Sequence, residues 1–568
     1  MYVLGISCFY HDSAVCLLKD GEIVAAIQEE RFTRVKHENG FPHRSIKYCL
    51  DIAGIKIKDV NYVGFYEKPF LKFERLLEGY LDTFPKSYRA FMKAMKVWLK
   101  EKLWIKERIK EELKYNGKIY FIEHHLAHAA SSYLVSPFKE SAFLTVDAVG
   151  EWTTASFGIA RGSDIEILKE ITWPDSLGML YSAFTYYLGF RVNSAEYKVM
   201  GAAPYGKPIY TDLIKKNLIR IKDDGSFKLN MKYFKYHYGL VMTGKKFEHL
   251  FGHPRRQPES EIEQFHWDMA ASIQEITNEV MVKTANYLYK ETKLKNLCLS
   301  GGVALNCVSN SKILEQTDFE NIFINPAAGD AGGAMGIAVY IDNVILKNNR
   351  RTKLETTYLG PEFSDSEIEH FLSDQRVSYI KLEENALVNK TASLIADQKI
   401  IGWFQGRMEW GPRALGNRSI IADARNKENW KRVNLKIKFR ESFRPFAPSV
   451  LEEKSQEYFD VPKNTLGEGT PTPYMILVAK VKDKNIPAVT HVNNTARLQT
   501  VSQKQNRLYY NLIKEFENQT GCGVIINTSF NVRGEPIVCT PQDAFNCFQR
   551  TEMDYLVMGS YLVKKKNL

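Results

Sequence analysis

The chain has 568 residues, of which 44% are apolar and 25% charged, so it has the composition of a globular protein too long for one hydrophobic core. Its 77 Lys and Arg against 66 Asp and Glu give a net charge of +11, which favours an anionic small molecule, nucleic acid or an acidic partner without choosing among them. No uncharged apolar run approaches the ~18 residues that a membrane span needs, and no secretory pattern opens the sequence, so we expect a cytoplasmic protein without a membrane span. The eight cysteines form no Cys-x-x-Cys pair, which predicts buried, reduced thiols.

The first 28 residues predict three antiparallel strands, over 2–7, 13–18 and 23–28, with an Asp20-Gly21 hairpin between the second and third. Such a start, with a polar first turn, is typical of actin-like ATPase folds, whose turns cradle phosphates through backbone N–H groups. His11 and Asp12 lie in that turn. They either face a reacting group or only make local hydrogen bonds.

A basic segment follows. Residues 86–118 contain eleven Lys and Arg against four Glu, with apolar residues at near-helical spacing. This pattern predicts an amphipathic helical insertion with a solvated basic face. A role at a membrane surface or on a polyanion is the alternative.

A possible pair of metal ligands comes next. A strand over 119–122 leads into an alanine-rich helix that should end before Pro137. His124 and His128 are four residues apart, so on a helix they share one face, as two nitrogen ligands of a transition metal do. Surface or satisfied core histidines have the same spacing. A strand over 141–146 ends in Asp147, and two imidazoles with one carboxylate would suit Zn or Fe.

Two segments, 296–306 and 322–336, each predict a buried strand, a glycine turn and a helix. Glycine lets the backbone approach a ligand, and a helix N-terminus favours an anion, so the two segments together indicate a nucleotide-binding site. Either segment alone could instead reflect tight packing of a strand against a helix. Asp330 in the second turn could instead reach the metal. Glu196 and Lys198 stand before a Gly/Pro turn, as at a ligand-lining loop or at a structural one.

Residues 345–354 are polar and basic, which predicts a linker, with one domain at 1–350 and a second at 355–568. The second contains arginines in apolar, glycine-rich segments, which predicts a phosphate site because Arg grips phosphate bidentately. A strand over 436–446 would point Lys438 and Arg440 to one side.

Together these segments resemble the NodU/CmcH/TobZ family of ATP-dependent O-carbamoyltransferases over nearly the whole chain. The resemblance rests on residues 9–14, the His124–His128 helix, the Asp147 segment, and residues 196–201, 300–306, 329–334, 411–419, 438–446 and 527–531. It implies an α/β protein with a Kae1-like domain of the actin/Hsp70 ATPase class at 1–350, carrying the basic insertion at about 68–118, and a YrdC-like α/β domain at 355–568. One departure is Ala148, where much of the family has glycine after the aspartate, so the geometry of that loop stays open.

The resemblance also implies the site residues. A metal, normally iron, would be held by His124, His128, Asp147 and Asp330. Catalytic roles are implied for His11, Asp12, Lys438 and Arg440. Nucleotide contacts are implied for Lys198, Gly301, Gly302, Asn306, Gly332, Gly333, Ser529 and Asn531. Carbamoyl phosphate contacts are implied for Arg413, Arg418, Arg444, Arg497 and Asn527.

The implied reaction makes carbamoyladenylate from carbamoyl phosphate and ATP in the second domain and then carbamoylates an alcohol at the metal site. We therefore expect ATP, Mg²⁺ and Fe²⁺ or another divalent metal as cofactors. The expected partners are carbamoyl phosphate, ATP and a small-molecule alcohol, with no stable nucleic-acid partner and with either a monomer or a homodimer. A tRNA threonylcarbamoyl-transfer enzyme, which uses the same fold types and would explain the basic charge, is the main alternative. A nucleotide-gated scaffold is a non-enzymatic one.

Overall fold

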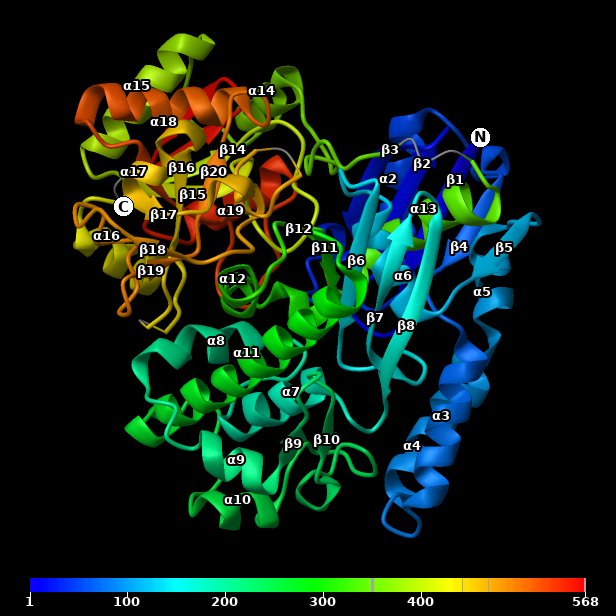
Figure 1. The fold of residues 1–568 in the computed structure, drawn as a ribbon. Coiled ribbons are helices and arrows are strands. Elements are labelled where there is room, and N and C mark those ends of the chain that lie inside the picture. The colour runs from blue at the N-terminus through cyan, green and yellow to red at the C-terminus, as the bar shows by residue number, and fades with distance from the viewer. Residues whose placement is uncertain (349–351, 442, 468, 566–568) are drawn as a thin grey trace. The chain divides into compact units, whose positions relative to one another are not determined.

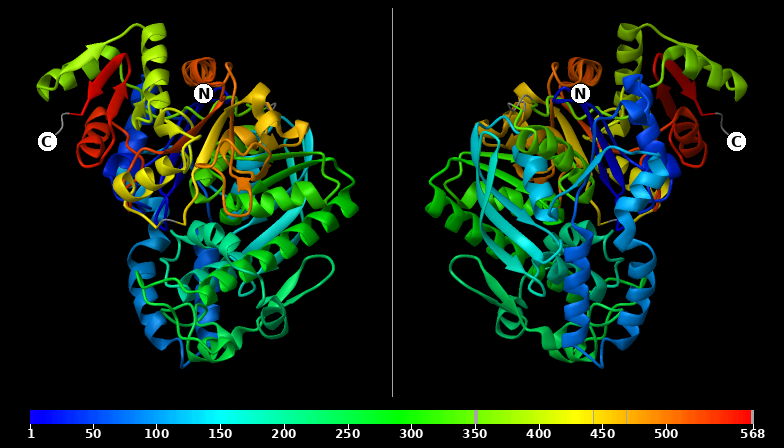
Figure 2. Two further views of the ribbon diagram at one scale, coloured as in Figure 1. Left: turned by 90° about the vertical axis from the view of Figure 1, so that its left-hand side faces the viewer. Right: turned by 90° about the vertical axis from the view of Figure 1, so that its right-hand side faces the viewer.

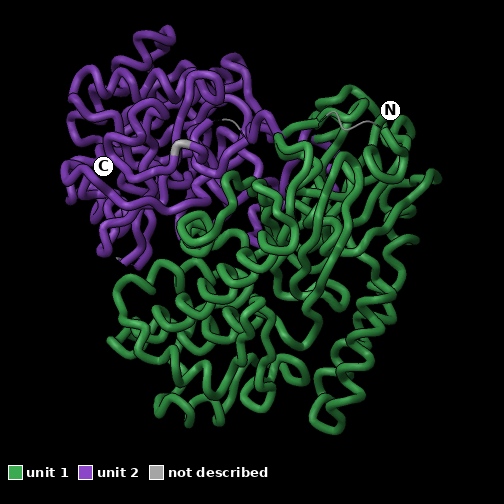
Figure 3. Tube along the Cα trace, in the orientation of Figure 1, with its two compact units in different colours: residues 1–24, 39–42, 49–353 green, residues 25–38, 43–48, 354–568 purple. Residues whose placement is uncertain are grey.

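The structure is a computed structural model that describes residues 1–348, 352–441, 443–467 and 469–565. The mixed α/β chain forms two compact units (Figure 3). The N-terminal unit comprises residues 1–24, 39–42 and 49–353, and the C-terminal unit comprises residues 25–38, 43–48 and 354–568. The predicted linker at 345–354 includes residues 349–351, which lie outside the described residues. Within the described ranges no helix has the length and apolar character that crossing a membrane requires.

The first sheet, all of it in the N-terminal unit except Ala25–Gln28 of its third strand, confirms the three predicted strands. It has the order β3-β2-β1-β4-β5, built from β1 (Tyr2–Ser7), β2 (Ala14–Lys19), β3 (Glu22–Gln28), β4 (Tyr62–Phe65) and β5 (Lys118–Phe121). The hairpin lies at Asp20 and Gly21, whose φ angles of 51° and 85° are both positive, as a type I′ turn requires. β1 pairs antiparallel with β2 and parallel with β4, and β4 pairs parallel with β5.

The second sheet of this unit has the order β12-β11-β6-β7-β8. Its strands are β6 (Glu140–Val146), β7 (Thr153–Arg161), β8 (Asp164–Thr172), β11 (Asn296–Ser300) and β12 (Asn321–Ile324). Helices α6 (His124–Tyr133) and α13 (Asp330–Tyr340) pack on each other between the two sheets, with α6 against β6 and β11 and α13 against β1, β2 and β4 (Figure 1). This layering brings the starts of both helices close to the ends of the strands.

Two glycines permit this close packing. A Cβ at Gly336 of α13 would lie 2.0 Å from the carbonyl oxygen of Ala127 in α6. A Cβ at Gly5 of β1 would lie 1.9 Å from the carbonyl oxygen of Ala334 in α13. Any side chain at either position would force the layers apart.

The basic insertion is helical, as predicted. It consists of α3 (Pro69–Asp82), α4 (Tyr88–Lys100), a short 3₁₀ turn and α5 (Ile105–Leu113). α3 and α4 run side by side as a blue pair of helices (Figures 1 and 2). The remaining longer helices of the unit are α7 (Leu177–Tyr187), α8 (Glu196–Ala202), α9 (Thr211–Asn217), α10 (Lys245–Phe251), α11 (Gln264–Thr292) and α12 (Cys307–Gln316). Helix α2 (His43–Ala53) begins in residues of the C-terminal unit and ends in residues of the N-terminal unit.

A buried ion pair anchors the insertion. Lys72 of α3 donates to Glu67 at 2.6 Å, and Glu67 is 0% exposed. Lys72→Met is expected to destabilise the N-terminal unit by about 3–5 kcal/mol, because it leaves a buried carboxylate without its cation. Thermal unfolding monitored by circular dichroism measures this, and Glu67→Leu with Lys72→Met in one chain is the matched control, expected to recover most of the loss. A single variant as stable as the parent would contradict the prediction.

The larger sheet of the C-terminal unit has the order β13-β23-β22-β14-β15-β21-β16-β20, and a smaller one of β17 (Phe459–Asp460), β18 (Ala479–Val481) and β19 (Thr495–Ala496) has the order β17-β18-β19. The strands of the larger sheet are β13 (Tyr379–Lys381), β14 (Ile401–Phe404), β15 (Arg418–Asp423), β16 (Ala447–Leu451), β20 (Gln499–Val501), β21 (Val524–Ser529), β22 (Tyr555–Met558) and β23 (Tyr561–Lys564). The longer helices of the unit are α14 (Asp365–Asp374), α15 (Glu384–Ala396), α18 (Arg507–Thr520) and α19 (Pro541–Gln549). Residues 25–38 and 43–48, although early in the sequence, belong to this unit. Arg34, for example, donates to the carbonyls of Pro536 and Ile537 at 2.7 and 2.6 Å.

One predicted strand is wrong. Helix α16 (Lys427–Arg432) continues into a π-helical turn at Val433–Ile437, and Lys438 and Arg440 follow in irregular backbone before β16. Asn426 caps α16 by accepting from the backbone N–H of Glu428. Val433 and Ile437, four apart, are both buried, so the helical period wins over the alternation that suggested a strand. The cysteines are all free and buried, as expected.

Candidate functional site

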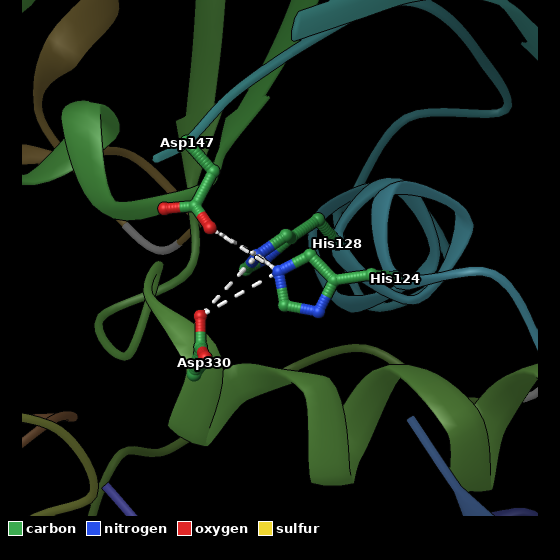
Figure 4. A group of neighbouring side chains, drawn as sticks. All are labelled: His124, His128, Asp147 and Asp330. Atoms are coloured by element: carbon green, nitrogen blue, oxygen red, sulfur yellow. Dashed lines mark hydrogen bonds and ion pairs between the residues drawn. The ribbon is translucent and has the colours of Figure 1, made fainter. Parts of the chain in front are cut away.

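Two histidines and two aspartates converge in the N-terminal unit (Figure 4). His124 and His128 lie one turn apart on α6, and their Nε2 atoms are 3.0 Å from each other. Asp147 Oδ2 lies 3.2 Å from Nε2 of His124 and 3.8 Å from Nε2 of His128. Asp330 Oδ1 lies 3.6 and 3.8 Å from the same two nitrogens. The structure thus brings together the four residues that the sequence suggested as metal ligands.

The backbone around Asp147 fixes its carboxylate. Asp147 follows the last residue of β6, and its Oδ1 accepts the backbone N–H of Gly302 at 2.9 Å, which leaves Oδ2 for the histidines. β6 and β11 pair in parallel, so their carboxyl ends meet at one edge. Gly301 has φ +90°, and a Cβ there would lie 2.2 Å from the carbonyl oxygen of Val146. Glycine is therefore needed for this loop to reach Asp147. Ala148, the departure noted in the sequence, has a carbonyl that accepts from the Ser176 hydroxyl at 2.6 Å.

This donor set fits a divalent transition metal. Ligand atoms at about 2.1 Å from one cation lie roughly 3–4 Å from one another, and the separations above span 3.0–3.8 Å. The two Nε2 atoms lie 3.0 Å apart and both face the carboxylates, so the lone pairs of two neutral imidazoles could bind one cation together with Asp147 and Asp330. Mixed imidazole and carboxylate ligands suit Fe(II) or Zn.

The charges of His124, His128, Asp147 and Asp330, called the His/Asp quartet below, agree with a cation site. Burial raises the pKa of Asp147, but hydrogen bonds from His124 and His128 outweigh it and hold that pKa well below its ordinary value. Burial lowers the pKa of His124, but Asp330 and Asp147 outweigh it and raise the pKa. The site therefore attracts positive charge. A cation would replace the protons, because imidazole binds metal only in its neutral form.

His11 lies at the edge of the quartet. Its Nε2 is 3.5 Å from Asp330 Oδ2, and its Nδ1 is 3.0 Å from Asp12 Oδ2. The turn between β1 and β2 that carries both residues includes positive φ angles at Phe9 and Asp12, 76° and 53°. Burial lowers the pKa of His11, but Asp330 and Asp12 outweigh it and raise the pKa to about 10.

Two important carboxylates were given no role by the sequence. Glu151 accepts the backbone N–H of His124 at 3.0 Å and that of Lys68 at 2.7 Å, so it caps the helix that carries both histidines. In the C-terminal unit, one oxygen of Glu409 accepts the backbone N–H groups of Leu415, Asn417 and Arg418. Both glutamates are buried, and acidic residues among glycines were the only signal in the sequence.

The predicted cationic residues of the C-terminal unit gather at one edge of its sheet. β15, β21, β16 and β20 are neighbours in that order, with Ser419 opposite Ser529, Ala447 opposite Asn527 and Ser449 beside Gln499. The segments just before β15, β16 and β20 contain Arg413, Arg444 and Arg497, and the segment just after β21 contains Asn531. All four segments therefore lie at the same edge.

Lys438 joins this edge. Its ammonium donates to the carbonyl oxygens of Ser529 and Asn531 at 2.6 and 2.8 Å, to Asn531 Oδ1 at 2.6 Å and to Ser529 Oγ at 3.2 Å. Burial, and next the charges of Arg440 and Arg444, lower its pKa well below the ordinary value for lysine. Arg440 donates to Asn434 Oδ1 at 2.7 Å. The sequence-predicted Lys438, Ser529 and Asn531 are thus in direct contact.

The predicted contact of Arg418 with carbamoyl phosphate needs a correction. Its side chain is 0% exposed, and its guanidinium donates to the backbone carbonyls of Gln405, Gly406, Asn417 and Pro361 and lies 3.8 Å from the ring centroid of Phe404. It holds the loop together and does not face a ligand.

Several residues predicted to contact nucleotide, and Asn527, predicted to contact carbamoyl phosphate, make structural contacts within their own units. A Cβ at Gly332 would meet the carbonyl of Ala327 at 2.2 Å, and one at Gly333 would meet Tyr66 at 2.6 Å, so both glycines serve helix packing. Asn306 caps α12 by accepting from Ser309 N. The amide of Asn527 donates to Ala414 O and Gln499 Oε1. The ammonium of Lys198 lies 5.4 Å from the ring centroid of Phe190.

Comparison with known proteins places this geometry in one family. Residues 2–339 match the carbamoyltransferase N-terminus and residues 392–565 match the carbamoyltransferase C-terminus. The chain belongs to the carbamoyltransferase family. It is 51% identical to an uncharacterized protein of Synechocystis over 99% of this chain and 97% of that one. It is 37% identical to nodulation protein NolNO of Sinorhizobium fredii over 98% of this chain and 79% of that one.

A third relative of this carbamoyltransferase has a named reaction. It is the 3'-hydroxymethylcephem-O-carbamoyltransferase of Streptomyces clavuligerus, 32% identical over 46% of this chain and 47% of that one. Among solved structures, full-length HypF in its phosphate- and nucleotide-bound form is 14% identical, over 62% of this chain and 56% of that one, with a TM-score of 0.31.

Proposed function

We propose that this carbamoyltransferase is an ATP-dependent O-carbamoyltransferase with two reaction centres. The cationic sheet edge of the C-terminal unit, YrdC-like in this proposal, would bind carbamoyl phosphate and Mg²⁺-ATP and form carbamoyladenylate. The His/Asp quartet of the N-terminal unit, Kae1-like in this proposal, would receive the carbamoyl group for transfer to a hydroxyl. The balanced reaction consumes carbamoyl phosphate, ATP, water and an alcohol and yields the carbamate ester, AMP, pyrophosphate and phosphate.

The observation that carries this proposal is the quartet with His11 beside it. A divalent metal held by His124, His128, Asp147 and Asp330 would supply Lewis acidity toward the carbamoyl oxygen. His11 Nε2 lies 3.5 Å from Asp330, and with its pKa raised to about 10 the ring is protonated and can donate to the carbamoyl group. A cation in the quartet would offset the charge of Asp330 and lower that pKa, which would let His11 take the proton of the attacking hydroxyl. Asp12, bonded to Nδ1 of His11, fixes the ring for that role.

The C-terminal residues support the first half-reaction. Lys438 holds the Ser529–Asn531 segment at the sheet edge, and Arg413, Arg440, Arg444 and Arg497 lie on segments at or beside that edge. Clustered cations neutralise phosphates, and a mixed anhydride made inside the protein is shielded from water. The acceptor is proposed to be a small molecule of the natural-product or sugar type, because the named relatives act in nodulation or on a cephem.

Product analysis tests the proposal. The protein, loaded with Fe²⁺ and Mg²⁺-ATP, is incubated with a panel of polyhydroxylated acceptors and either carbamoyl phosphate or bicarbonate with threonine. We expect pyrophosphate release only with carbamoyl phosphate, and a carbamate ester of one acceptor by mass spectrometry. Pyrophosphate release only with threonine and bicarbonate would favour threonylcarbamoyl transfer and overturn the proposal, and release with neither would point to a scaffold.

A further inference from the structure

The hairpin of α3 and α4 exposes apolar side chains to solvent. About half of the large apolar side chains that are exposed in the described residues lie between Phe70 and Trp104. On α3 the most exposed are Phe70 at 69% and Leu81 at 63%. On α4 they are Tyr88 at 56%, Leu99 at 56% and Met92 at 53%. Exposed apolar side chains that gather on one element mark a contact surface.

These side chains share one side of the hairpin. The two helices touch through Phe73 and Trp98, with ring centroids 5.7 Å apart, and through Tyr80 and Phe91, 6.0 Å apart. α3 turns Lys72 and Arg75 toward the body of the unit, where they meet Glu67 and Trp173. Because successive helix residues are about 100° apart, Phe70 and Leu81 point away from that body, and so do Tyr88, Met92 and Leu99 of the antiparallel α4. The result is one apolar strip along the outer face.

Charges of opposite sign border the strip. The exposed side of α3 adds Glu74, Glu78 and Asp82, which we call the acidic edge. The exposed side of α4 adds Arg89, Lys93, Lys96 and Lys100, which we call the basic edge. No ion pair within the described residues uses any of these seven groups, because the two edges point away from each other on opposite flanks of the hairpin.

We propose that this face binds the same face of a second copy of the chain. A twofold axis parallel to the helices would lay α3 of one copy over α4 of the other, so that each acidic edge meets a basic edge and the apolar strips meet in the middle. A twofold axis across the helices would place like charges together, so the charge pattern selects the first arrangement. An anionic membrane fits less well, because the acidic edge would face the lipid headgroups.

The arrangement predicts specific pairs. Within the hairpin Tyr80 faces Phe91 and Phe73 faces Trp98, which fixes how far along the helix axes the residues of α3 and α4 lie, called their height below. On this scale Asp82 lies level with Arg89, Glu78 with Lys93 and Glu74 with Lys96. The twofold axis along the helices preserves height, so Asp82 would pair with Arg89, Glu78 with Lys93 and Glu74 with Lys96 of the second copy. Two helices of this length cover on the order of 400 Å², below the ~800 Å² per partner of a standard interface, so we expect a dimer with a micromolar Kd.

A charge swap tests the proposal. Sedimentation equilibrium of the full chain, from the low micromolar range to about 100 µM, is expected to show a monomer–dimer equilibrium that weakens with salt. An acidic-edge variant, E74K with E78K, and a basic-edge variant, K93E with K96E, should each dimerise at least about tenfold more weakly, since like charges now meet. An equimolar mixture of the two should dimerise again, because both edges are complementary in the mixed pair.

The control is K106E with K110E on α5, which changes two exposed lysines of the same insertion away from the face and should dimerise as the parent does. Circular dichroism of each variant checks that the helices are formed. A parent that stays monomeric throughout the range, or a mixture that stays monomeric while the parent dimerises, would overturn the proposal. So would a monomeric parent that sediments with phosphatidylglycerol vesicles, which would make a lipid surface the occupant.

Discussion

Replacing His128 with alanine is expected to stop carbamoylation of the acceptor while pyrophosphate release from ATP continues. The variant removes one of the two facing imidazole nitrogens, 3.0 Å from its neighbour, and leaves the C-terminal sheet edge unchanged. Product formation should fall by more than about 100-fold, because a metal site that loses a ligand loses both affinity and geometry. Pyrophosphate release dependent on carbamoyl phosphate should stay within about twofold of the parent value.

The matched control is His125→Gln, on the same helix. The His125 ring contacts Thr145 Oγ1 at 2.6 Å through Nδ1 and lies outside the quartet. Metal content by inductively coupled plasma mass spectrometry gives a readout besides activity, and it should fall for His128→Ala but not for His125→Gln. If His128→Ala folds and binds as much metal as the parent, the assignment of the quartet is wrong. If it folds but loses pyrophosphate release, the two-centre proposal is wrong.

The local order of the quartet could be read from the sequence, but its assembly could not. The four-residue spacing of His124 and His128 on a helix, and the position of Asp147 after a strand, follow from helical and strand periods. That Asp330, 183 residues after Asp147, meets them depends on parallel pairing of β6 with β11 and β11 with β12, which no local pattern encodes. The glycine turn left Asp330 as a possible metal ligand, and only the family resemblance assigned it to the quartet.

The missed residues share a physical cause. Glu151 accepts hydrogen bonds from backbone N–H groups of distant segments. Glu409 accepts them from the backbone N–H groups of Leu415, Asn417 and Arg418. A carboxylate that stabilises a loop looks like any acidic residue in a sequence, because its partners are main-chain groups without residue identity. For Arg418 the reverse holds, because a residue with structural partners was predicted to bind a ligand. An arginine among glycines has the sequence pattern of a phosphate ligand, and only the structure shows its carbonyl partners.

For the segment around Lys438 the predicted strand is wrong, while the predicted catalytic role of Lys438 and Arg440 stays a prediction. The cations at Lys436, Lys438 and Arg440 alternate with the two-residue period of a strand. The buried Val433 and Ile437, however, follow the helical period of α16. The irregular backbone after the π-helical turn is what lets Lys438 reach the end of β21.

Lys438→Met is expected to abolish pyrophosphate release, with a loss of more than about 100-fold. Methionine keeps the apolar stem but removes an ammonium that contacts four acceptor oxygens of Ser529 and Asn531. Hydrogen bonds from a charged donor contribute about 1.5–3 kcal/mol each, and about 1.4 kcal/mol is a factor of ten in rate. The loss of two of these hydrogen bonds is therefore enough for a decrease of about 100-fold. Because burial lowers the pKa of Lys438 and the charged form is lost as the pH rises through that pKa, the parent should lose this activity at a lower pH than an ordinary lysine would give.

Lys436→Met separates a local effect from a general loss of positive charge. Lys436 lies two residues away and pairs at 3.0 Å with Glu552, with both side chains more than half exposed, so its variant should keep parent-level pyrophosphate release. Asn531→Ala, which removes one of the acceptor oxygens, should fall between the two. Thermal unfolding of all three shows whether the C-terminal unit is folded, and titration with ATP measures nucleotide affinity independently of turnover. A folded Lys438→Met that releases pyrophosphate at the parent rate would remove Lys438 from the adenylate-forming site and leave it only as the tie between the π-helical turn and the end of β21.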